Sequence, residues 1–289
     1  MEEKNLINLS IIVILFVQNY NFVFDKLIKT LILYILKITF IGSGNLAWYL
    51  SDTLQENGHE IVEIWSRSER NARLLASKLN CNIISRLNDL DNTDLIIISV
   101  KDDVIVEVLN KIKVSNAPIV HTSGSVGADV FKNRENFGVF YPIQSFNKNI
   151  DVNFNEIPIC IEANNSELEK KLIILAKSIS NSVHLLNSKQ REQLHIAAVF
   201  SSNFTNHMMS ISEEILNSNK MSFDLLKPLI KNTFEKIKNN PPKDVQTGPA
   251  IREDYLIIKK HLESLEEYDD LKTIYSKISN HIISNNFNE

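Results

Sequence analysis

The chain has 289 residues, of which 44% are hydrophobic and 23% charged, a composition typical of a globular protein of about two domains. Its formal net charge of −4 excludes the basic surplus of a nucleic-acid-binding protein, so we expect no nucleic-acid partner. Cys81 and Cys160 lie far apart, and the seven histidines have no metal-ligand spacing. We therefore expect two buried free thiols, no metal site and a cytoplasmic location.

Residues 1–36 form an apolar N-terminal extension with two hydrophobic runs, at 10–17 and 31–36. Neither run reaches the ~18–20 apolar residues that a membrane-spanning helix needs. The extension could be a membrane-surface helix, a helix packed on the fold or on a partner, or translated upstream sequence. We favour the last interpretation and expect no membrane partner, because the next segment has the features of the first strand of a domain.

That next segment carries a Gly-rich turn. A short apolar strand at 38–41 is followed by Gly42-x-Gly44-x-x-Ala47 and by a helix-periodic run at 46–54. In this context the first glycine permits a tight turn, the second lets a pyrophosphate approach, and the helix N-terminus attracts phosphate. Two of only seven glycines fall on the motif. The expected phosphate-binding residues are Gly42, Ser43, Gly44, Asn45 and Leu46; the alternative is a strand–turn–helix that binds nothing.

The end of the second expected strand, residues 61–65, indicates which dinucleotide is bound. An NAD site usually has an acidic residue there to hold the ribose 2′-hydroxyl, but this chain has Ser66-Arg67-Ser68. A guanidinium flanked by two hydroxyls suits a 2′-phosphate, so we predict NADP as the cofactor. Alternatively, Ser68 caps the following helix and Arg67 is solvated, and both interpretations can hold together.

Two further apolar strands, at 94–100 and 118–121, are each followed by polar residues. Ligands of open α/β sheets bind beyond the carboxyl ends of the strands, so we expect Val100 and Lys101 to line the cofactor groove. Asp102 more simply caps the next helix. Ser123 is expected to reach the nicotinamide or the substrate, unless its loop is only a polar turn.

Strand patterns at 137–141, 157–161 and 183–186, with an amphipathic helix at 168–179, continue the alternation of strands and helices. This alternation predicts an α/β fold with a doubly wound Rossmann-like parallel sheet over residues 37–187. From residue 188 to 289 the pattern is helical, which predicts an all-α C-terminal domain.

The first C-terminal helix is expected at 189–218. His195, Ser202 and Asn206 would share one stripe of this helix, with Asn203 beside it. Such a cluster indicates either a polar pocket or a hydrogen-bonded core histidine.

Later helices are expected at 225–237, with Pro228 in the first turn, and at 268–283. Between them, Pro249 is expected to open a helix that has Arg252 near its start. A cation is disfavoured there, so Arg252 needs a partner such as Asp254, a substrate anion or the cofactor.

Taken together, these segments resemble the predicted short-subunit dehydrogenases, in which a Rossmann-like domain precedes a domain of unknown function numbered 2520. Pyrroline-5-carboxylate, ketopantoate and 6-phosphogluconate reductases or dehydrogenases are similar at a greater distance. The resemblance implies an NADP-dependent oxidoreductase that acts on a small carbonyl, imine or hydroxy compound bound between the two domains. The segments that carry it are 41–47, 66–68, 121–125, 138–146, 195–204 and 247–254.

The chain departs from the family pattern at three places. Lys101 stands where proline is common, and Glu253 where we expect a smaller residue. The lysine that hydroxyacid dehydrogenases place four residues before an asparagine is also missing, since Val199 and Ser202 occupy those positions.

His195 is therefore the candidate proton donor, because an imidazole titrates near working pH. Asn203, Asn206 or Arg252 would orient the substrate. The missing lysine leaves open a non-catalytic NADP-binding regulator or scaffold. The long apolar C-terminal helices are compatible with a homodimer.

Overall fold

The computed structural model describes residues 35–87, 90, 93–113, 116–148 and 150–286, so the three interpretations of the N-terminal extension concern a segment that lies outside the described residues, except for its end. Leu36, which we had assigned to that extension, already belongs to the fold. Its side chain is buried in the main core, and its carbonyl accepts a hydrogen bond from the Glu60 amide. The chain divides into two compact units, one up to Asn206 and one from His207.

The first unit is built on an eight-stranded sheet with the order β3-β2-β1-β4-β5-β6-β7-β8. Neighbouring strands are parallel except β6 and β7, so the expected doubly wound α/β sheet is confirmed as a mostly parallel one. In the described part of the connection from β6 to β7, the helical structure is one short 3₁₀ turn, η3 (Phe154–Glu156). An antiparallel neighbour needs no crossover helix. The strands are β1 (Lys37–Ile41), β2 (Glu60–Trp65), β3 (Asn82–Ile83), β4 (Leu95–Ile98), β5 (Ile119–His121), β6 (Phe137–Pro142), β7 (Ile159–Ala163) and β8 (Val183–Leu185).

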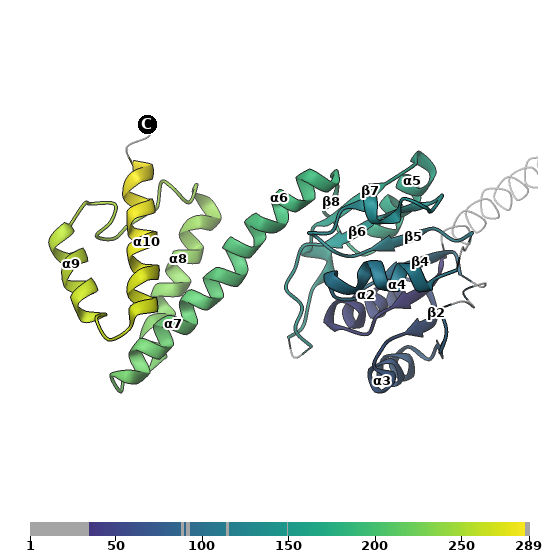
Figure 1. Ribbon diagram of the computed structural model, residues 1–289, viewed down its shortest axis with the longest axis horizontal. Coiled ribbons are helices and arrows are strands. Elements are labelled where there is room, and N and C mark those ends of the chain that lie inside the picture. The colour runs from purple at the N-terminus through teal and green to yellow at the C-terminus, as the bar shows by residue number, and fades with distance from the viewer. Residues whose placement is uncertain (1–34, 88–89, 91–92, 114–115, 149, 287–289) are drawn as a thin grey trace, which may run out of the picture. The chain divides into compact units, whose positions relative to one another are not determined.

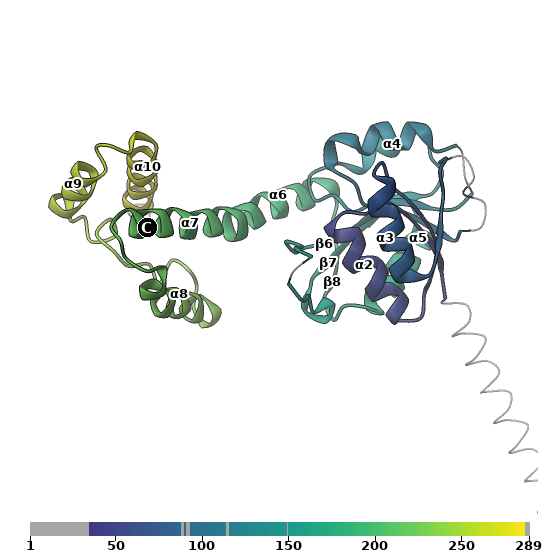
Figure 2. The same ribbon diagram turned by 90° about the horizontal axis from the view of Figure 1, so that it is seen from below.

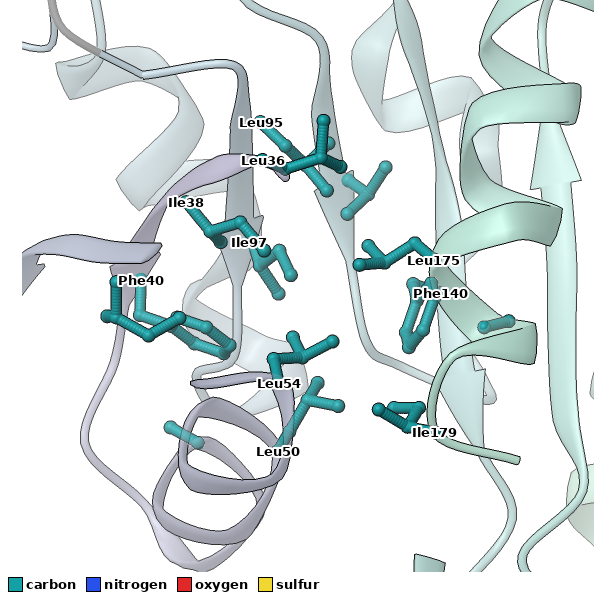
Figure 3. Close-up of a cluster of buried hydrophobic side chains, with 14 of the residues drawn as sticks. Leu36, Ile38, Phe40, Leu50, Leu54, Leu95, Ile97, Phe140, Leu175 and Ile179 are labelled. Carbon is teal, nitrogen blue, oxygen red and sulfur yellow. The ribbon is translucent and has the colours of Figure 1, made fainter. Parts of the chain in front are cut away.

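Both faces of the sheet are covered by helices (Figures 1 and 2). Strand β4 shows why, because Leu95 and Ile97 pack into one core and Ile96 and Ile98 into the other. The first core is covered by α2 (Asn45–Glu56), α3 (Glu69–Leu79) and α5 (Ser166–Lys177), and the second by α4 (Ile105–Lys111) and the 3₁₀ turn η2 (Ala128–Phe131). Figure 3 shows side chains of α2 and α5 meeting those of β1, β4 and β6 in the first core.

The strand order places a topological switch point between β1 and β4. From β1 the chain builds β2 and β3 on one side and then returns to β4 on the other side, in parallel register with Ile41 opposite Ile98. The connections leave in opposite directions there, which opens a crevice at the carboxyl ends of these two strands. This crevice is where an open α/β sheet binds its ligand.

The helix expected at 189–218 consists of three parts: α6 (Ser188–Ala198), a π-helical segment η4 (Val199–Phe204) and α7 (Thr205–Ser218). Asn187 and Gln190 form a reciprocal capping box at the start of α6. In the wider π turn the Thr205 hydroxyl donates to the Phe200 carbonyl, five residues earlier, at 3.2 Å. Residues after η4 are thereby rotated relative to the stripe that a regular α-helix would give.

The second unit contains the remaining helices, which are η5 (Phe223–Leu226, 3₁₀), α8 (Lys227–Asn239), α9 (Tyr255–Ser264) and α10 (Asp269–Asn286). Pro228 lies in the first turn of α8, as expected. The expectation that Pro249 opens a helix is wrong, because residues 249–253 form turns and Asp254 caps α9. Arg252 therefore precedes the helix. Glu253 has a left-handed backbone (φ 54°), a conformation that a residue with a Cβ seldom adopts, so a glycine would fit this position better.

Within the part of the chain that the structure describes, no helix combines the length and the apolar character needed to cross a membrane. The same residues contain no group of three or more His, Cys, Asp or Glu side chains that could hold a metal ion. Both cysteines are free, and burial raises the pKa of each thiol to about 11, so neither is a reactive thiolate at neutral pH.

Candidate cofactor and active site

A cleft of about 600 Å³ lies at the carboxyl ends of β1, β2, β4 and β5, in the first unit. All eleven residues predicted to bind the cofactor line it, although they come from four separate stretches of sequence. The parallel strands explain this convergence, because their carboxyl ends share one edge of the sheet. These residues are Gly42, Ser43, Gly44, Asn45, Leu46, Ser66, Arg67, Ser68, Val100, Lys101 and Ser123.

The two glycines of the turn meet different demands. Gly42 has φ +123°, its amide donates to the Trp65 carbonyl at 2.7 Å, and a Cβ there would lie 1.9 Å from the Ser99 carbonyl oxygen. A Cβ on Gly44 would meet no atom within 4 Å. Gly44 is also the N-cap of α2, where no side chain caps the helix. The turn thus combines a free surface with the positive end of a helix, which fits a pyrophosphate.

At the end of β2 the sequence left two interpretations of Ser66-Arg67-Ser68, and features of both are present. Ser68 caps α3 by accepting a hydrogen bond from the Asn71 amide at 3.4 Å. The Ser66 hydroxyl pairs with that of Ser43 at 2.7 Å, which ties this segment to the phosphate turn. Arg67 is exposed on the cleft wall, where it is available to an anion.

Asp102 does not cap a helix, so that expectation is wrong. No side chain caps the 3₁₀ turn η1 (Asp102–Val104), and the Asp102 carboxylate instead accepts a hydrogen bond from the Ser125 hydroxyl at 2.5 Å. Ser123 accepts hydrogen bonds from the amides of Ser125 and Val126, at 3.1 and 3.0 Å. The loop after β5 is therefore both an organised turn and part of the cleft wall.

His195 reaches the cleft from α6 and is half-buried there. Its Nδ1 lies 3.1 Å from the Tyr141 hydroxyl, and the two rings meet edge to face. A Cβ on Gly124 would lie 2.6 Å from His195 Nδ1 and 2.7 Å from Tyr141 Cζ, so a glycine is required where this pair contacts the loop. The sequence did not single out Tyr141, although a tyrosine at the carboxyl end of a parallel strand was a usable signal.

A buried charge network holds α6 against the sheet. The Arg191 guanidinium, 1% exposed, pairs with the Glu162 carboxylate of β7 and donates to the Val126 carbonyl at 2.6 Å. The Ser188 hydroxyl donates to Glu162 at 2.9 Å and accepts from the Ala128 amide at 3.0 Å. Arg191 lies one helical turn before His195, so this network also fixes the position of the cleft histidine.

His121, at the end of β5, lies within the same region and is fully buried. Its Nδ1 accepts a hydrogen bond from the Ser123 amide at 3.1 Å, and its ring stacks on Phe131. Burial, reinforced by the charge of Arg191 and opposed in part by the Gly127 backbone and Asp102, lowers the pKa of His121 to about 4. His121 is therefore a neutral structural residue at neutral pH.

The other predicted catalytic residues are placed differently. Asn203 lies in the π-helical segment and Asn206 in α7; both are exposed, and neither lines the cleft. Arg252 belongs to the second unit, in the turns before α9. Their proposed contacts with substrate stay predictions.

Two protein-family models match separate segments of the chain. Residues 37–122 match the family described as "NADP oxidoreductase coenzyme F420-dependent", and residues 157–282 match a domain of unknown function, DUF2520. A crystal structure described as "putative NADP oxidoreductase BF3122", from Bacteroides fragilis, is 38% identical, with a TM-score of 0.81 over 87% of this chain and 99% of that one. The chain belongs to the family of BF3122. The combination of domains expected from the sequence is thereby confirmed.

More distant structures share the fold. A 1-pyrroline-5-carboxylate reductase from Streptococcus pyogenes is 16% identical, with a TM-score of 0.59 over 88% of this chain and 98% of that one. An imine reductase from Myxococcus stipitatus, solved in complex with NADP+, is 15% identical, with a TM-score of 0.58 over 86% of this chain and 92% of that one. No curated protein matches the chain significantly. At these identities the likeness shows a shared fold.

Proposed function

We propose that this protein transfers a hydride between NADP(H) and a small carbonyl, imine or hydroxy compound, as an enzyme of the short-subunit dehydrogenase type. The observation that carries the proposal is a single cleft at the switch point, lined by an uncapped glycine turn, by Arg67 and by the Tyr141–His195 pair. Bound NADPH would supply the hydride. The protein supplies binding, orientation and electrostatics.

Each of three regions of the cleft would bind a different part of the cofactor. The amides after Gly44 and the dipole of α2 would hold the pyrophosphate. Ser66, Arg67 and Ser68 would hold the ribose 2′-phosphate, for which a guanidinium fork and hydroxyl donors are suited. Val100, Lys101 and Ser123 would line the nicotinamide end.

His195 would donate the proton that accompanies hydride transfer. When the Tyr141 hydroxyl donates to Nδ1, the neutral ring carries its hydrogen on Nε2; when the ring is protonated, Nδ1 donates to the phenol oxygen instead. The contact therefore persists through both protonation states. Burial raises the pKa of Tyr141, so the phenol keeps its proton at neutral pH.

The remaining elements of the proposal concern substrate and assembly. Asn203, Asn206 and Arg252 would orient the substrate through amide and guanidinium groups. A homodimer is proposed because the second unit exposes large apolar side chains, among them Leu225 (66%), Leu229 (61%) and Leu256 (78%).

The cofactor part is tested by fluorescence titration of the full chain with NADPH and NADH. We expect NADPH to bind at least about tenfold more tightly, and Arg67→Ala to remove about 1.4 kcal/mol or more of that preference. Arg70→Ala is the matched control, because Arg70 is an exposed arginine three residues later that does not line the cleft. Equal affinities would contradict the assignment of Arg67. If neither nucleotide binds, both the enzyme and the nucleotide-binding regulator are wrong.

The catalytic part is tested with His195→Gln. We expect NADPH affinity to stay within about twofold, and NADPH oxidation by a small carbonyl or imine to slow by about 100-fold, the lower range for loss of a general acid. His184→Gln, which changes an exposed histidine outside the cleft, should match the unsubstituted protein. If the unsubstituted protein binds NADPH but none of the tested carbonyls or imines causes its oxidation, the non-catalytic NADP-binding regulator is the correct alternative.

A further inference from the structure

The cleft that Arg67 lines also contains a charged pair that the sequence did not single out. Glu107 and Lys111 of α4 line the same cleft, one helical turn apart. The Lys111 ammonium and the Glu107 carboxylate are 2.5 Å apart, with side chains 55% and 61% exposed. An i, i+4 pair of this kind holds both side chains against the helix surface, here facing a ligand space.

Both cations act electrostatically on the Glu107 carboxylate. The pKa of Glu107 is lowered, first by the hydrogen bond and charge of Lys111 and to a smaller extent by the charge of Arg67. The carboxylate is thus ionised at neutral pH and lies under the influence of two cations. Arg67, Lys111 and Glu107 together carry a net charge of +1, whereas a phosphate monoester carries about −1.5 to −2 at pH 7.

We propose that Lys111 and Glu107 set the cofactor preference together with Arg67: Lys111 attracts the 2′-phosphate of NADPH, and Glu107 opposes it. Before nucleotide binds, Glu107 is the counter-ion of Lys111; a 2′-phosphate competes for the same ammonium and is repelled by the same carboxylate. The 2′-hydroxyl of NADH carries no charge, so its binding does not depend on the charges of Lys111 and Glu107. This inference rests on the proposed function, because it requires the nucleotide to lie with its ribose beside residues 66–68.

The two charges predict opposite effects, which a general loss of structure would not produce. With Lys111→Ala we expect NADPH to bind roughly fivefold more weakly, as for loss of one exposed charge pair, and with Glu107→Gln roughly fivefold more tightly. NADH affinity should change by less than about twofold in both variants. Lys113→Ala is the matched control, since Lys113 is an exposed lysine two residues later that does not line the cleft.

The measurement is fluorescence titration of the full chain with NADPH and NADH, repeated by calorimetry with 2′,5′-ADP and 5′-ADP, which isolate the phosphate-bearing end. Far-UV circular dichroism verifies that each variant folds. The inference is overturned if Lys111→Ala weakens NADPH and NADH equally, or if both variants match Lys113→Ala while Arg67→Ala still loses selectivity. In that second outcome the proposed function survives. If the unsubstituted protein binds neither nucleotide, the proposed function and this inference fail together.

Discussion

Replacing Arg191 by methionine is expected to lower the free energy of unfolding by about 3–5 kcal/mol, the usual cost of removing one partner of a buried ion pair. Arg191 is 1% exposed and Glu162 is 21% exposed. Without the guanidinium, the Glu162 carboxylate keeps the Ser188 hydroxyl but loses its counter-charge in a poorly solvated place. The Val126 carbonyl loses its 2.6 Å donor as well. Urea unfolding at pH 7 gives the value.

Two comparisons separate the charge from the packing. Glu162→Leu together with Arg191→Met removes both charges, and we expect it to recover a large part of the loss, because an apolar pair replaces a desolvated ionic one. Arg134→Met is a control of the same chemistry, since the hydrogen bonds that Arg134 makes to the described residues go to backbone carbonyls at 2.5–3.0 Å, outside the network. A loss below about 1 kcal/mol in Arg191→Met would contradict the assignment of a buried, paired charge.

Acidification from pH 6.5 to pH 4 is expected to cost about 3 kcal/mol of stability through His121 alone. Its pKa falls from 6.5 to about 4 on folding, because burial and the charge of Arg191 disfavour the imidazolium. The unfolded chain binds this proton below pH 6.5, whereas the folded chain stays neutral to about pH 4. Stability is therefore fully present above pH 6.5 and declines as the pH falls to about 4.

His121→Asn isolates this contribution. Asparagine does not titrate in this range, and its Oδ1 can accept the Ser123 amide as Nδ1 does. The free energy of unfolding is measured in urea at several pH values. Between pH 6.5 and 4, the variant should lose about 3 kcal/mol less stability than the unsubstituted protein. The pKa of His59 is also lowered by burial, so part of the slope remains in both proteins. Parallel curves would contradict the buried, neutral state of His121.

The parts of the site that were predictable depend on local sequence. The turn at Gly42 and Gly44 is fixed by a short strand, two glycines and the start of a helix, all within residues 37–47. Parallel strands then bring the other cofactor residues to one edge of the sheet. The antiparallel direction of β7 was not predictable, because apolar periodicity is the same in either direction. The two-residue strand β3 is exposed and has no periodicity to read.

The pairings that complete the site depend on contacts distant in sequence. Tyr141 and His195 are 54 residues apart, and Arg191 and Glu162 are 29 apart. Neither pair has a sequence pattern, since each half alone is an ordinary strand or helix residue. The helix expected from Pro249 was wrong for a similar reason. The left-handed backbone of Glu253 depends on the surrounding turns, and this local context overrides the preference of proline for a helix start.

The glycine turn has a consequence for how descendants of this protein would diverge. Gly42 is required by the chain itself, since any Cβ would collide with the Ser99 carbonyl, whereas Gly44 has an ordinary φ of −72° and faces open space. Selection for folding and selection for a ligand therefore act on different residues of the same turn. A homologue that no longer bound a nucleotide would keep Gly42 and accumulate substitutions at position 44. A family member with glycine at position 42 and another residue at position 44 would thus be expected to have lost nucleotide binding.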